Sequence, residues 1–485
     1  MEGHPMTAIT LRTFTGETSE ASAARMEALR SALHGGLALP GDYGYDQART
    51  IWNAMVDRRP GLVIRAANTS DVSQSVNFAR EHGAVLSVRG GGHQIAGYAV
   101  NDGGILLDLS QMRAVRVDPA ARCAQVGPGA TLGDFDRCAQ SFGLATPTGI
   151  NSTTGIAGLT LGGGFGWITR KFGMTIDNLL SAEVVTADGQ VRRVSVTETP
   201  DLFWAIRGGG GNFGVVTSFE FQLHPVGPDV LCGLVVHPLD AAPQLLRQYD
   251  EIANTAADEL AVWAVLRRAP PLPFIPVEWH GREVLAFAAC YCGDVRDGET
   301  ALAELRGLGQ PIAGAVGPQP FAQWQTTFDP LLTPGARNCW KSHDFMDLSE
   351  AMVGALLAGV SKLPSPECEV FIGHLGGAMA KVPVEATAYP QRQSHFVMNV
   401  HTRWREQADD AACIAWARQL FDATAPYAAG SVYVNFIPDD EVSRVSAAYG
   451  PNMQRLAQIK HRYDPTNLFR MNHNIAPASS ASAAA

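Results

Sequence analysis

The sequence predicts an α+β fold with more than one domain, and three observations support this. The chain has 485 residues, which is enough for two or three domains. In the first half, short strand-like and helix-like segments are mixed without the regular alternation of a parallel α/β fold. After Pro225, apolar strand candidates are separated by longer amphipathic helices, so we expect a second domain of different architecture.

The first half is predicted to be built from short elements. Gly35 ends the first helix, Ser70 and Asp71 cap the second, and Phe142 lies on the apolar face of the third. In chain order, the predicted elements are helix 22–34, strand 62–65, a helix between 70 and 83, strand 85–89, strands 104–109 and 114–117, helix 131–142, a hairpin over 181–195 turned at Asp188-Gly189, and strand 215–223.

The second half contains three predicted amphipathic helices, at 240–255, 349–362 and 406–424. Pro-rich stretches at 269–276 and 364–366 are predicted to be connecting loops. The predicted boundaries are 45–226 for the first domain, 227–428 for the second, 429–477 for a separate motif-rich segment, and 478–485 for a disordered Ser/Ala tail.

The composition argues against two classes of protein. With 37 Lys and Arg against 47 Asp and Glu, the net charge is −10, and broad nucleic-acid recognition needs a basic surface. A small polyanionic ligand remains possible, because helix N-termini and glycine-rich backbone hold phosphates without net positive charge. No apolar run approaches the roughly 18–20 residues that span a bilayer. We expect no nucleic-acid partner and no membrane partner.

The termini and cysteines favour a cytoplasmic protein. The N-terminus lacks a basic segment followed by an apolar run, so no secretory signal is predicted. The eight cysteines are scattered without a Cys-x-x-Cys pair, which favours small buried side chains over disulfides or a zinc site. Cys290 and Cys292 alternate along an apolar strand-like run and are predicted to lie in the core.

Glycine is enriched, with 49 residues, about 10% against an average near 7%. The first glycine segment is Arg89-Gly-Gly-Gly-His93, which directly follows a predicted strand. Three glycines let backbone N–H groups approach a ligand such as a pyrophosphate without interference from a Cβ atom. A sharp exposed turn with an incidental histidine explains this segment equally well.

The second glycine segment, residues 147–166, is almost all small, hydroxyl or amide side chains as far as Gly158. Such a stretch cannot make a packed helix or strand of its own, so we interpret it as a loop that wraps a large flat ligand. The alternative is a flexible linker, but Ile150, Ile156, Leu159 and Leu161 make the segment too apolar for that.

The third glycine segment, residues 208–214, formally fits the dinucleotide pattern G-x-G-x-x-G. That pattern requires a strand before it and a helix after it, whereas here a helix-like stretch precedes and strand 215–223 follows. A P-loop motif is also missing from the sequence. We therefore predict a glycine-rich nucleotide cradle of non-Rossmann type.

Together these segments resemble the berberine-bridge-enzyme-like family, specifically its bacterial branch within the vanillyl-alcohol-oxidase (PCMH-type) flavoproteins. The resemblance covers nearly the whole chain. It depends on the three glycine segments, on Tyr433-Val-Asn435-Phe, and on the stretch 463–475 (YDPTNLFRMNHNI), in this order.

The resemblance implies the following architecture and cofactor. FAD lies between two small α+β subdomains of a PCMH-type FAD-binding domain, to which residues 429–477 return. An antiparallel-sheet substrate domain covered by helices closes the site. The histidine that ends the first glycine segment, His93, is bonded to the 8α carbon of the flavin. Many relatives add a cysteinyl bond at the position of Asn151, so this chain is expected to carry a single tether.

The resemblance also implies the other cofactor contacts. Three glycines, Gly90 to Gly92, would meet the pyrophosphate, and the Val216 backbone would face the adenine. The expected cofactor-binding residues are Arg89, Gly90, Gly91, Gly92, His93, Gln94, Gly149, Asn151, Thr153, Thr154, Gly155, Gly158, Gly164, Val216, Asn435, Asn472 and Asn474.

The implied chemistry is hydride transfer from a substrate C–H bond to flavin N5, followed by reoxidation with O2. Thr154 and Leu159 fall where relatives shape oxygen access to the reactive edge. Relatives that oxidise sugars or alcohols carry tyrosines at Phe165 and Phe436, and their loss favours an aromatic or polyketide-like substrate. The expected catalytic residues are Thr154, Leu159, His374 and Tyr433, with Glu369 as a further candidate base.

Three alternatives remain at this point. The same scaffold can serve a flavin-dependent oxygenase, in which the product gains an oxygen atom. A flavin-binding protein that has lost its chemistry is a second alternative, which the missing tyrosines favour and His93 opposes. A non-covalent NAD(P)H reductase is disfavoured because the sequence has no nicotinamide fingerprint. The expected partners are a small-molecule substrate and O2, and the expected state is a monomer or homodimer.

Overall fold

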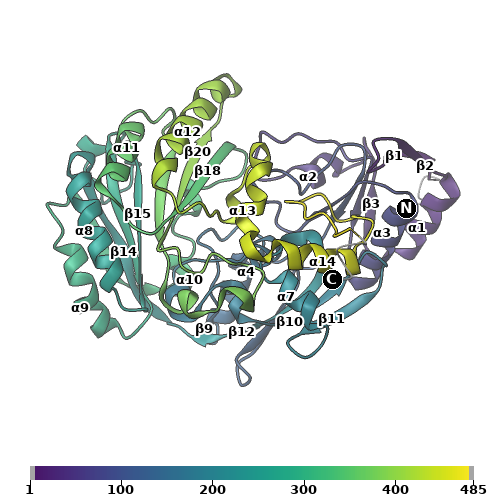
Figure 1. The fold of residues 1–485 in the computed structure, drawn as a ribbon, viewed down its shortest axis with the longest axis horizontal. Helices are drawn as coiled ribbons and strands as arrows, with labels where there is room; N and C mark the ends of the chain where they lie inside the picture. The colour runs from purple at the N-terminus through teal and green to yellow at the C-terminus, as the bar shows by residue number, and fades with distance from the viewer. Residues whose placement is uncertain (1–5, 480–485) are drawn as a thin grey trace.

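The computed structural model describes residues 6–479 and shows two halves that lie side by side (Figure 1). One half holds two small sheets, and the other holds one large antiparallel sheet with helices on its outer face. The predicted α+β class is confirmed. None of the helices within residues 6–479 has both the length and the apolar character needed to cross a membrane.

The first small sheet has the strand order β3-β4-β6-β5, with parallel pairing of β6 to both β4 and β5. The predicted β-α-β unit is confirmed, but Asn68 caps its helix instead of Ser70 and Asp71. Asp71 is fully buried, and its carboxylate accepts hydrogen bonds from the backbone of His34, Gly35 and Ala67. The elements are α1 (Ala23–Ala32), β3 (Gly36–Ala38), α2 (Tyr45–Arg49), β4 (Leu62–Arg65), α3 (Thr69–Glu81), β5 (Leu86–Arg89) and β6 (Ile105–Asp108), preceded by the hairpin β1 (Ile9–Arg12) and β2 (Thr18–Ala21).

The second small sheet is antiparallel, with the order β11-β10-β12-β8-β7. The predicted hairpin over 181–195 is confirmed as β10 and β11. The helix predicted at 131–142 ends earlier, at Gln140, so Phe142 lies in the following turn and is 52% exposed. The elements are β7 (Val115–Asp118), β8 (Cys123–Val126), α4 (Leu132–Gln140), β10 (Leu179–Val185), β11 (Val191–Ser195), α7 (Pro200–Ile206) and β12 (Val215–Gln222).

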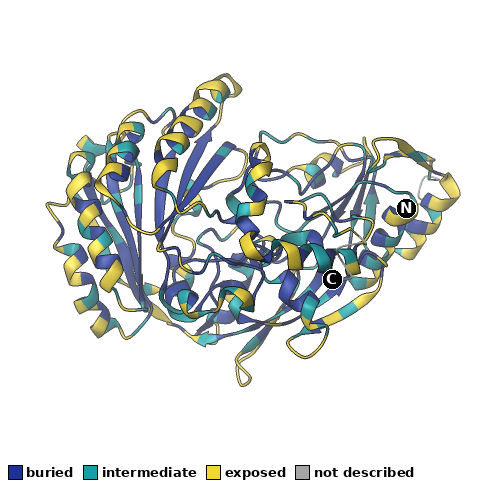
Figure 2. Ribbon diagram, in the orientation of Figure 1, coloured by how far each residue is buried: buried dark blue, intermediate teal, exposed yellow. Residues whose placement is uncertain are grey.

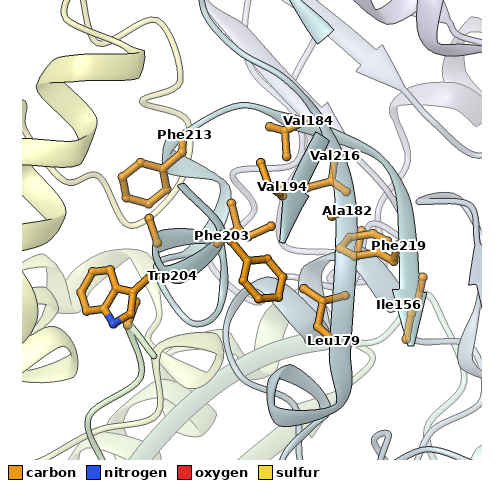
Figure 3. Close-up of a cluster of buried hydrophobic side chains, with 14 of the residues drawn as sticks. Ile156, Leu179, Ala182, Val184, Val194, Phe203, Trp204, Phe213, Val216 and Phe219 are labelled. Atoms are coloured by element: carbon orange, nitrogen blue, oxygen red, sulfur yellow. The ribbon is translucent and has the colours of Figure 1, made fainter. Parts of the chain in front are cut away.

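A buried apolar cluster fixes the second small sheet to its helices (Figure 3). Phe203 and Trp204 of α7 pack with Val194 and Phe219 of the sheet. Ile156 belongs to α5 (Ile156–Leu161), a helix that lies inside the second glycine segment, where a loop was predicted over residues 147–166. Three of the four apolar residues that argued against a flexible linker, Ile156, Leu159 and Leu161, belong to this helix and pack in the cluster.

The large sheet has seven antiparallel strands in the order β17-β14-β16-β15-β19-β20-β18. Helices α8, α9, α11 and α12 lie along its outer face, with their exposed sides turned away from the strands (Figures 1 and 2). The bounds are β14 (Asp229–Pro238), α8 (Ala242–Thr255), β15 (Leu260–Arg268), β16 (Glu283–Tyr291), α9 (Val295–Arg306), β17 (Ala313–Pro320), β18 (Arg337–Phe345), α11 (Glu350–Val360), β19 (Glu369–His374), β20 (Phe396–Trp404) and α12 (Asp410–Thr424).

The three helices predicted in this half are confirmed as α8, α11 and α12, but α9 was not predicted. Few residues of α9 are buried, chiefly Leu302 and Leu305. Where the helix packs against Tyr291 it has Gly298 instead of a larger apolar residue, which interrupts the apolar periodicity expected of a helix. The cap residue Asp294 is the one clear sequence signal for its start. Cys290 is fully buried in β16 and Cys292 is buried just after it, which confirms that both are core residues.

The C-terminal part of the chain packs against the first half. Helix α13 (Val445–Tyr449) contributes Val445, and helix α14 (Met453–Tyr463) contributes Leu456 and Ile459, to the same cluster that contains Phe213. Ala478 donates a backbone hydrogen bond to Ala457, while residues 480–485 of the predicted disordered tail lie outside the described residues. The domain boundaries given above stay predictions.

Asp136 on α4 leads to a prediction about pH and stability. Its carboxylate is buried and accepts a hydrogen bond from Gln325 (3.0 Å), and burial raises its pKa to about 7. The unfolded chain has a pKa near 3.9, so the stabilising contribution of the protonated group is present below about pH 4 and is lost as the pH rises through 7.

We therefore expect Asp136→Asn to raise the midpoint of thermal unfolding at pH 8 by about 2 °C or more, and to raise it by clearly less at pH 5. Thermal unfolding of both proteins at the two pH values checks this. A variant that is equally destabilised at both pH values would show that the carboxylate is needed in its charged form.

Candidate functional site

A cavity of about 320 Å³ lies where the two halves of the molecule meet. This volume is typical of small-molecule and cofactor sites. Its walls come from all three glycine segments, from the C-terminal stretch and from the inner face of the large sheet. We call this space the main cavity.

Most of the predicted site residues line the main cavity, although they come from segments far apart in the chain. The predicted residues that line it are Gly90, Gly91, Gly92, His93, Gln94, Gly149, Asn151, Thr154, Gly155, Gly158, Leu159, Val216, Tyr433, Asn435 and Asn472.

Five predicted residues do not line the main cavity. Arg89 bonds to the backbone of Ala48, and Gly164 donates its N–H to the Tyr433 hydroxyl (3.0 Å). Thr153 is exposed and contacts His93, and Asn474 is exposed between the buried residues His473 and Ile475. The fifth is His374.

The glycines of the first two segments allow their backbones to touch. A Cβ atom on Gly91 would lie 2.4 Å from the amide nitrogen of Gly155 and 2.5 Å from its Cα atom. Gly92 has a φ of +67°, which favours glycine. A Cβ atom on Gly158 would meet no protein atom within 4 Å, so this glycine leaves the helix backbone open to the cavity.

His93 stands at the end of the first glycine segment. Its ring stacks on Trp52, with 4.4 Å between ring centroids and 22° between planes, and its Nε2 atom lies 3.2 Å from the Thr153 hydroxyl. Burial by the surrounding protein, helped by the nearby Arg403 and His401, lowers the pKa of His93 to about 3. The imidazole is therefore neutral at physiological pH and keeps a nucleophilic lone pair.

Asn151 positions Thr153, whose hydroxyl contacts His93. Its side-chain oxygen accepts hydrogen bonds from the backbone N–H (2.9 Å) and the hydroxyl (2.7 Å) of Thr153. Trp52, the other partner of His93, was missed by the sequence analysis, because it lies in a segment with no motif. Because Trp52 is buried and stacks on His93, the plane of the His93 imidazole is held nearly parallel to the indole ring.

Tyr433 lines the cavity but is unsuited to act as a base. Burial raises the pKa of Tyr433 to about 12, so its hydroxyl stays protonated. The hydroxyl oxygen accepts from Gly164 and from the Asn435 side chain (2.9 Å). Asn435 also donates to the backbone oxygens of Gly158 and Leu159, so the pair closes the cavity over α5.

The placement of His374 contradicts its predicted role as a base. Side chains alternate along β19, and His374 projects away from the cavity, where its Nε2 atom accepts from Arg170 (2.8 Å). Burial, with Arg170, lowers the pKa of His374 well below its usual value. Glu369 lies on the opposite face of the same strand and does line the cavity.

A polar cluster on the inner face of the large sheet surrounds Glu369. Its carboxylate oxygens lie 3.1 Å from Nδ1 of His401 and 2.5 Å from a guanidinium nitrogen of Arg267. Burial opposes ionisation, but Arg267 and His401 outweigh it and hold the pKa of Glu369 at about 2. The Nε2 atom of His401 and both polar atoms of the Asn399 amide are buried without a hydrogen-bond partner.

Asn399 and His401 were not among the residues predicted from the sequence. Both lie on β20, every residue of which is buried, so the sequence pattern does not reveal which face meets the cavity. The alternation Asn399-x-His401-x-Arg403, which places three polar side chains on one face of the strand, was the available signal.

An aromatic wall stands beside the polar cluster. The ring of Phe436 contacts those of Phe165 and Phe371, each with 5.9 Å between centroids, and Phe371 stacks on Trp263 at 5.4 Å. The two phenylalanines noted in the sequence therefore share one apolar surface.

A smaller space of about 70 Å³, which we call the apolar extension, lies beside the main cavity. The two spaces share Ile150, Trp263, Leu332, Glu369 and Phe371. The predicted Pro-rich loop at 269–276 closes the far end with Leu272, Phe274 and Ile275. Its other lining residues are almost entirely apolar.

A metal site is not formed by the described residues. Within 6–479, no three His, Cys, Asp or Glu side chains gather closely enough to hold a metal ion. The main cavity is lined by glycine backbone, amides, aromatic rings, the carboxylate of Glu369 and three histidines, His93, His401 and His473.

Comparisons with known proteins agree with this geometry. The family described as "FAD binding domain" matches residues 60–195, and the family "Berberine and berberine like" matches residues 432–476. The chain is 31% identical over 473 residues to (R)-6-hydroxynicotine oxidase of Paenarthrobacter nicotinovorans, covering 93% of this chain and 98% of the relative. It is 31% identical to an FAD-linked oxidoreductase of Dictyostelium discoideum, covering 88% and 91%.

Solved structures give the same result for the fold. The structure of 6-hydroxy-D-nicotine oxidase from Arthrobacter nicotinovorans superposes with a TM-score of 0.83 at 30% identity, covering 92% of this chain and 98% of that one. A berberine-bridge-enzyme-like protein of Physcomitrella patens also gives 0.83, at 23% identity, covering 94% and 99%.

Proposed function

The chain belongs to the berberine-bridge-enzyme-like family of FAD-linked oxidoreductases, and on this premise we propose that it is an oxidase with FAD attached through His93. FAD binding and oxidoreductase activity come with the family. The histidyl link, a small aromatic substrate and O2 as the electron acceptor are our proposal.

The main cavity fits FAD by the character of its walls. The first and third glycine segments present backbone N–H groups that suit a pyrophosphate. Gly158 leaves open space over α5, and the side-chain oxygen of Asn472 and both ring nitrogens of His473 are buried without partners. These groups would hold the cofactor, together with the Val216 backbone. When bound, FAD supplies the acceptor for a substrate hydride.

The observation that carries the proposal is the state of His93. It is neutral, it ends the first glycine segment, and Trp52 and Thr153 hold its ring in the cavity. A neutral imidazole in a fixed orientation is what a covalent link requires from the protein. Asn151 has no thiol, so we propose one tether and not two.

The substrate side of the cavity supports the remaining parts of the proposal. The wall built from Phe165, Phe371 and Phe436 suits an aromatic substrate. Thr154 and Leu159 line the same cavity, with a small polar and an apolar side chain. We propose that these two side chains bound the space that O2 reaches.

Acid precipitation of the purified protein tests the tether. We expect the yellow colour to stay in the pellet for the wild type and to move to the supernatant for His93→Ala. The matched control is His237→Gln, because His237 is a buried histidine outside both cavities. The control should keep its colour in the pellet. Release of flavin from the wild type would contradict the histidyl link, and a substrate screen by oxygen uptake follows if the link stands.

A further inference from the structure

We infer that His401, oriented by Glu369, is the catalytic base of this enzyme, and that the substrate is an aromatic hydroxyl compound whose apolar body enters the apolar extension. This inference rests on the proposed function and names its base and its substrate class. It depends on four features of the inner face of the large sheet.

The first feature is the pairing of His401 with Glu369. The two residues are directly opposite each other on the neighbouring strands β20 and β19. Because an ionised carboxylate only accepts hydrogen bonds, Nδ1 of His401 must carry the proton that Glu369 accepts. The lone pair then lies on Nε2, which is buried, unpartnered and part of a residue that lines the main cavity. A carboxylate that fixes a histidine tautomer in this way is a common device of general-base catalysis.

The second feature is the charge around His401. Glu369 faces it from β19, Arg267 from β15, Arg403 from its own strand, and His93 from the first glycine segment. Burial lowers the pKa of His401, the two arginines lower it further, and Glu369 opposes both effects. His401 is therefore neutral at physiological pH and able to accept a proton. Glu369 itself is too weak a base, because Arg267 and His401 already occupy its oxygens.

The third feature is Asn399, two residues before His401 on the same face of β20. Its amide offers a donor and an acceptor, and neither has a protein partner. Nε2 of His401 adds one more acceptor. A hydroxyl group can donate to Nε2 of His401 and accept from the amide nitrogen of Asn399, which satisfies two of these three atoms, whereas a hydrocarbon edge would leave all three without partners.

The fourth feature is the apolar extension behind Phe371 and Trp263. The one charged pair at its boundary, Arg267 with Glu369, is already neutralised internally. The extension therefore offers apolar contact and no charge for a ligand. A substrate with its hydroxyl group at His401 would place an apolar body against Phe371 and into this space.

The O–H bond of the substrate breaks, its proton goes to Nε2 of His401, and its electron pair forms the C=O bond of the product. A C–H bond on a side-chain carbon ortho or para to the hydroxyl group also breaks, and its electron pair leaves with the hydride, while the ring electrons shift to form a C=C bond to that carbon. Bound FAD would be the oxidant that accepts the hydride. The substrate loses two electrons and two hydrogens in all. The imidazolium formed beside Glu369 gains an ion pair that the neutral ring lacks, which lowers the barrier to proton transfer.

The test is binding of 4-nitrophenol to the flavin-loaded full-length protein, followed by the phenolate absorption band as the pH is varied. In the wild type, we expect the bound phenol to be more acidic than the free phenol. In His401→Gln, the bound phenol should be at least about tenfold less acidic than in the wild type. Glu369→Gln should fall between them, and the control His237→Gln should match the wild type.

Three outcomes would overturn the inference: a wild type that does not bind the phenol, a bound phenol no more acidic than the free one, or His401→Gln behaving as the wild type. Glu369→Gln provides a second route if His401→Gln does not fold. The flavin content of each sample is measured separately. Colourless protein would count against the proposed function, whereas flavin-loaded protein that fails the phenol test counts against His401 alone.

Discussion

Replacing Lys460 with methionine is expected to destabilise the protein by about 3–5 kcal/mol, because it leaves Asp464 as a buried charge without its partner. Both side chains are fully buried on the C-terminal stretch, with Nζ 2.6 Å from the carboxylate. Burial lowers the pKa of Lys460 to about 8, so the lysine is still charged at neutral pH. Urea unfolding of the wild type and the variant measures the loss.

The same substitution is expected to reduce flavin retention. Nζ of Lys460 also donates to the backbone oxygens of Asn212 (2.6 Å) and Phe469 (2.9 Å). Asn212 belongs to the third glycine segment, and its side chain bonds to the backbone of His473 and Ile475. The buried Lys460 side chain therefore connects the third glycine segment to the C-terminal stretch, both of which line the main cavity. Each segment loses a hydrogen bond when the lysine is replaced.

Lys381→Met is the matched control for Lys460→Met. Lys381 pairs with Asp258 at 2.6 Å, but its side chain is 72% exposed. Exposed ion pairs contribute about 0–1 kcal/mol, so the control should unfold close to the wild type. Equal unfolding midpoints for the two variants would show that the buried pair adds no more than the exposed one.

The glycine segments that line the main cavity could be predicted from the sequence, because runs of glycine indicate places where the backbone must come close to another group. Gly91 and Gly155 touch, and no larger residue fits at either position, which explains the glycines in both segments, although the contact itself was not predicted. The order of the motifs then sufficed to connect them to a known family. The role expected of His93 followed from that resemblance, because the first segment alone fits an exposed turn equally well.

The substrate wall could not be predicted in the same way, because it depends on strand orientation. His374 and Glu369 lie on one strand, but five positions separate them, so they project from opposite faces. Both faces of the large sheet are buried, one by helices and one by the cavity wall. The usual contrast between polar and apolar residues is therefore missing, and only the fold shows that Glu369 and His401 face the cavity.

Adding a single methyl group at Gly91 is expected to reduce the flavin content of the purified protein by more than about tenfold. The new Cβ atom would lie 2.4 Å from the Gly155 amide nitrogen, which is backbone and cannot rotate away. The first and second glycine segments must then separate, which displaces His93 relative to Thr153. Absorbance of flavin per mole of protein measures the effect in Gly91→Ala.

The comparison with Gly158→Ala identifies the cause, because both glycines line the main cavity. At Gly158 a Cβ atom meets no protein atom within 4 Å, and alanine favours a helix over glycine by about 1 kcal/mol. The flavin-free Gly158→Ala protein should therefore unfold no earlier than the wild type, whereas flavin-free Gly91→Ala should unfold earlier. If both variants lose flavin with unchanged unfolding midpoints, the cofactor alone requires these glycines, and the contact between Gly91 and Gly155 does not hold the two segments in place.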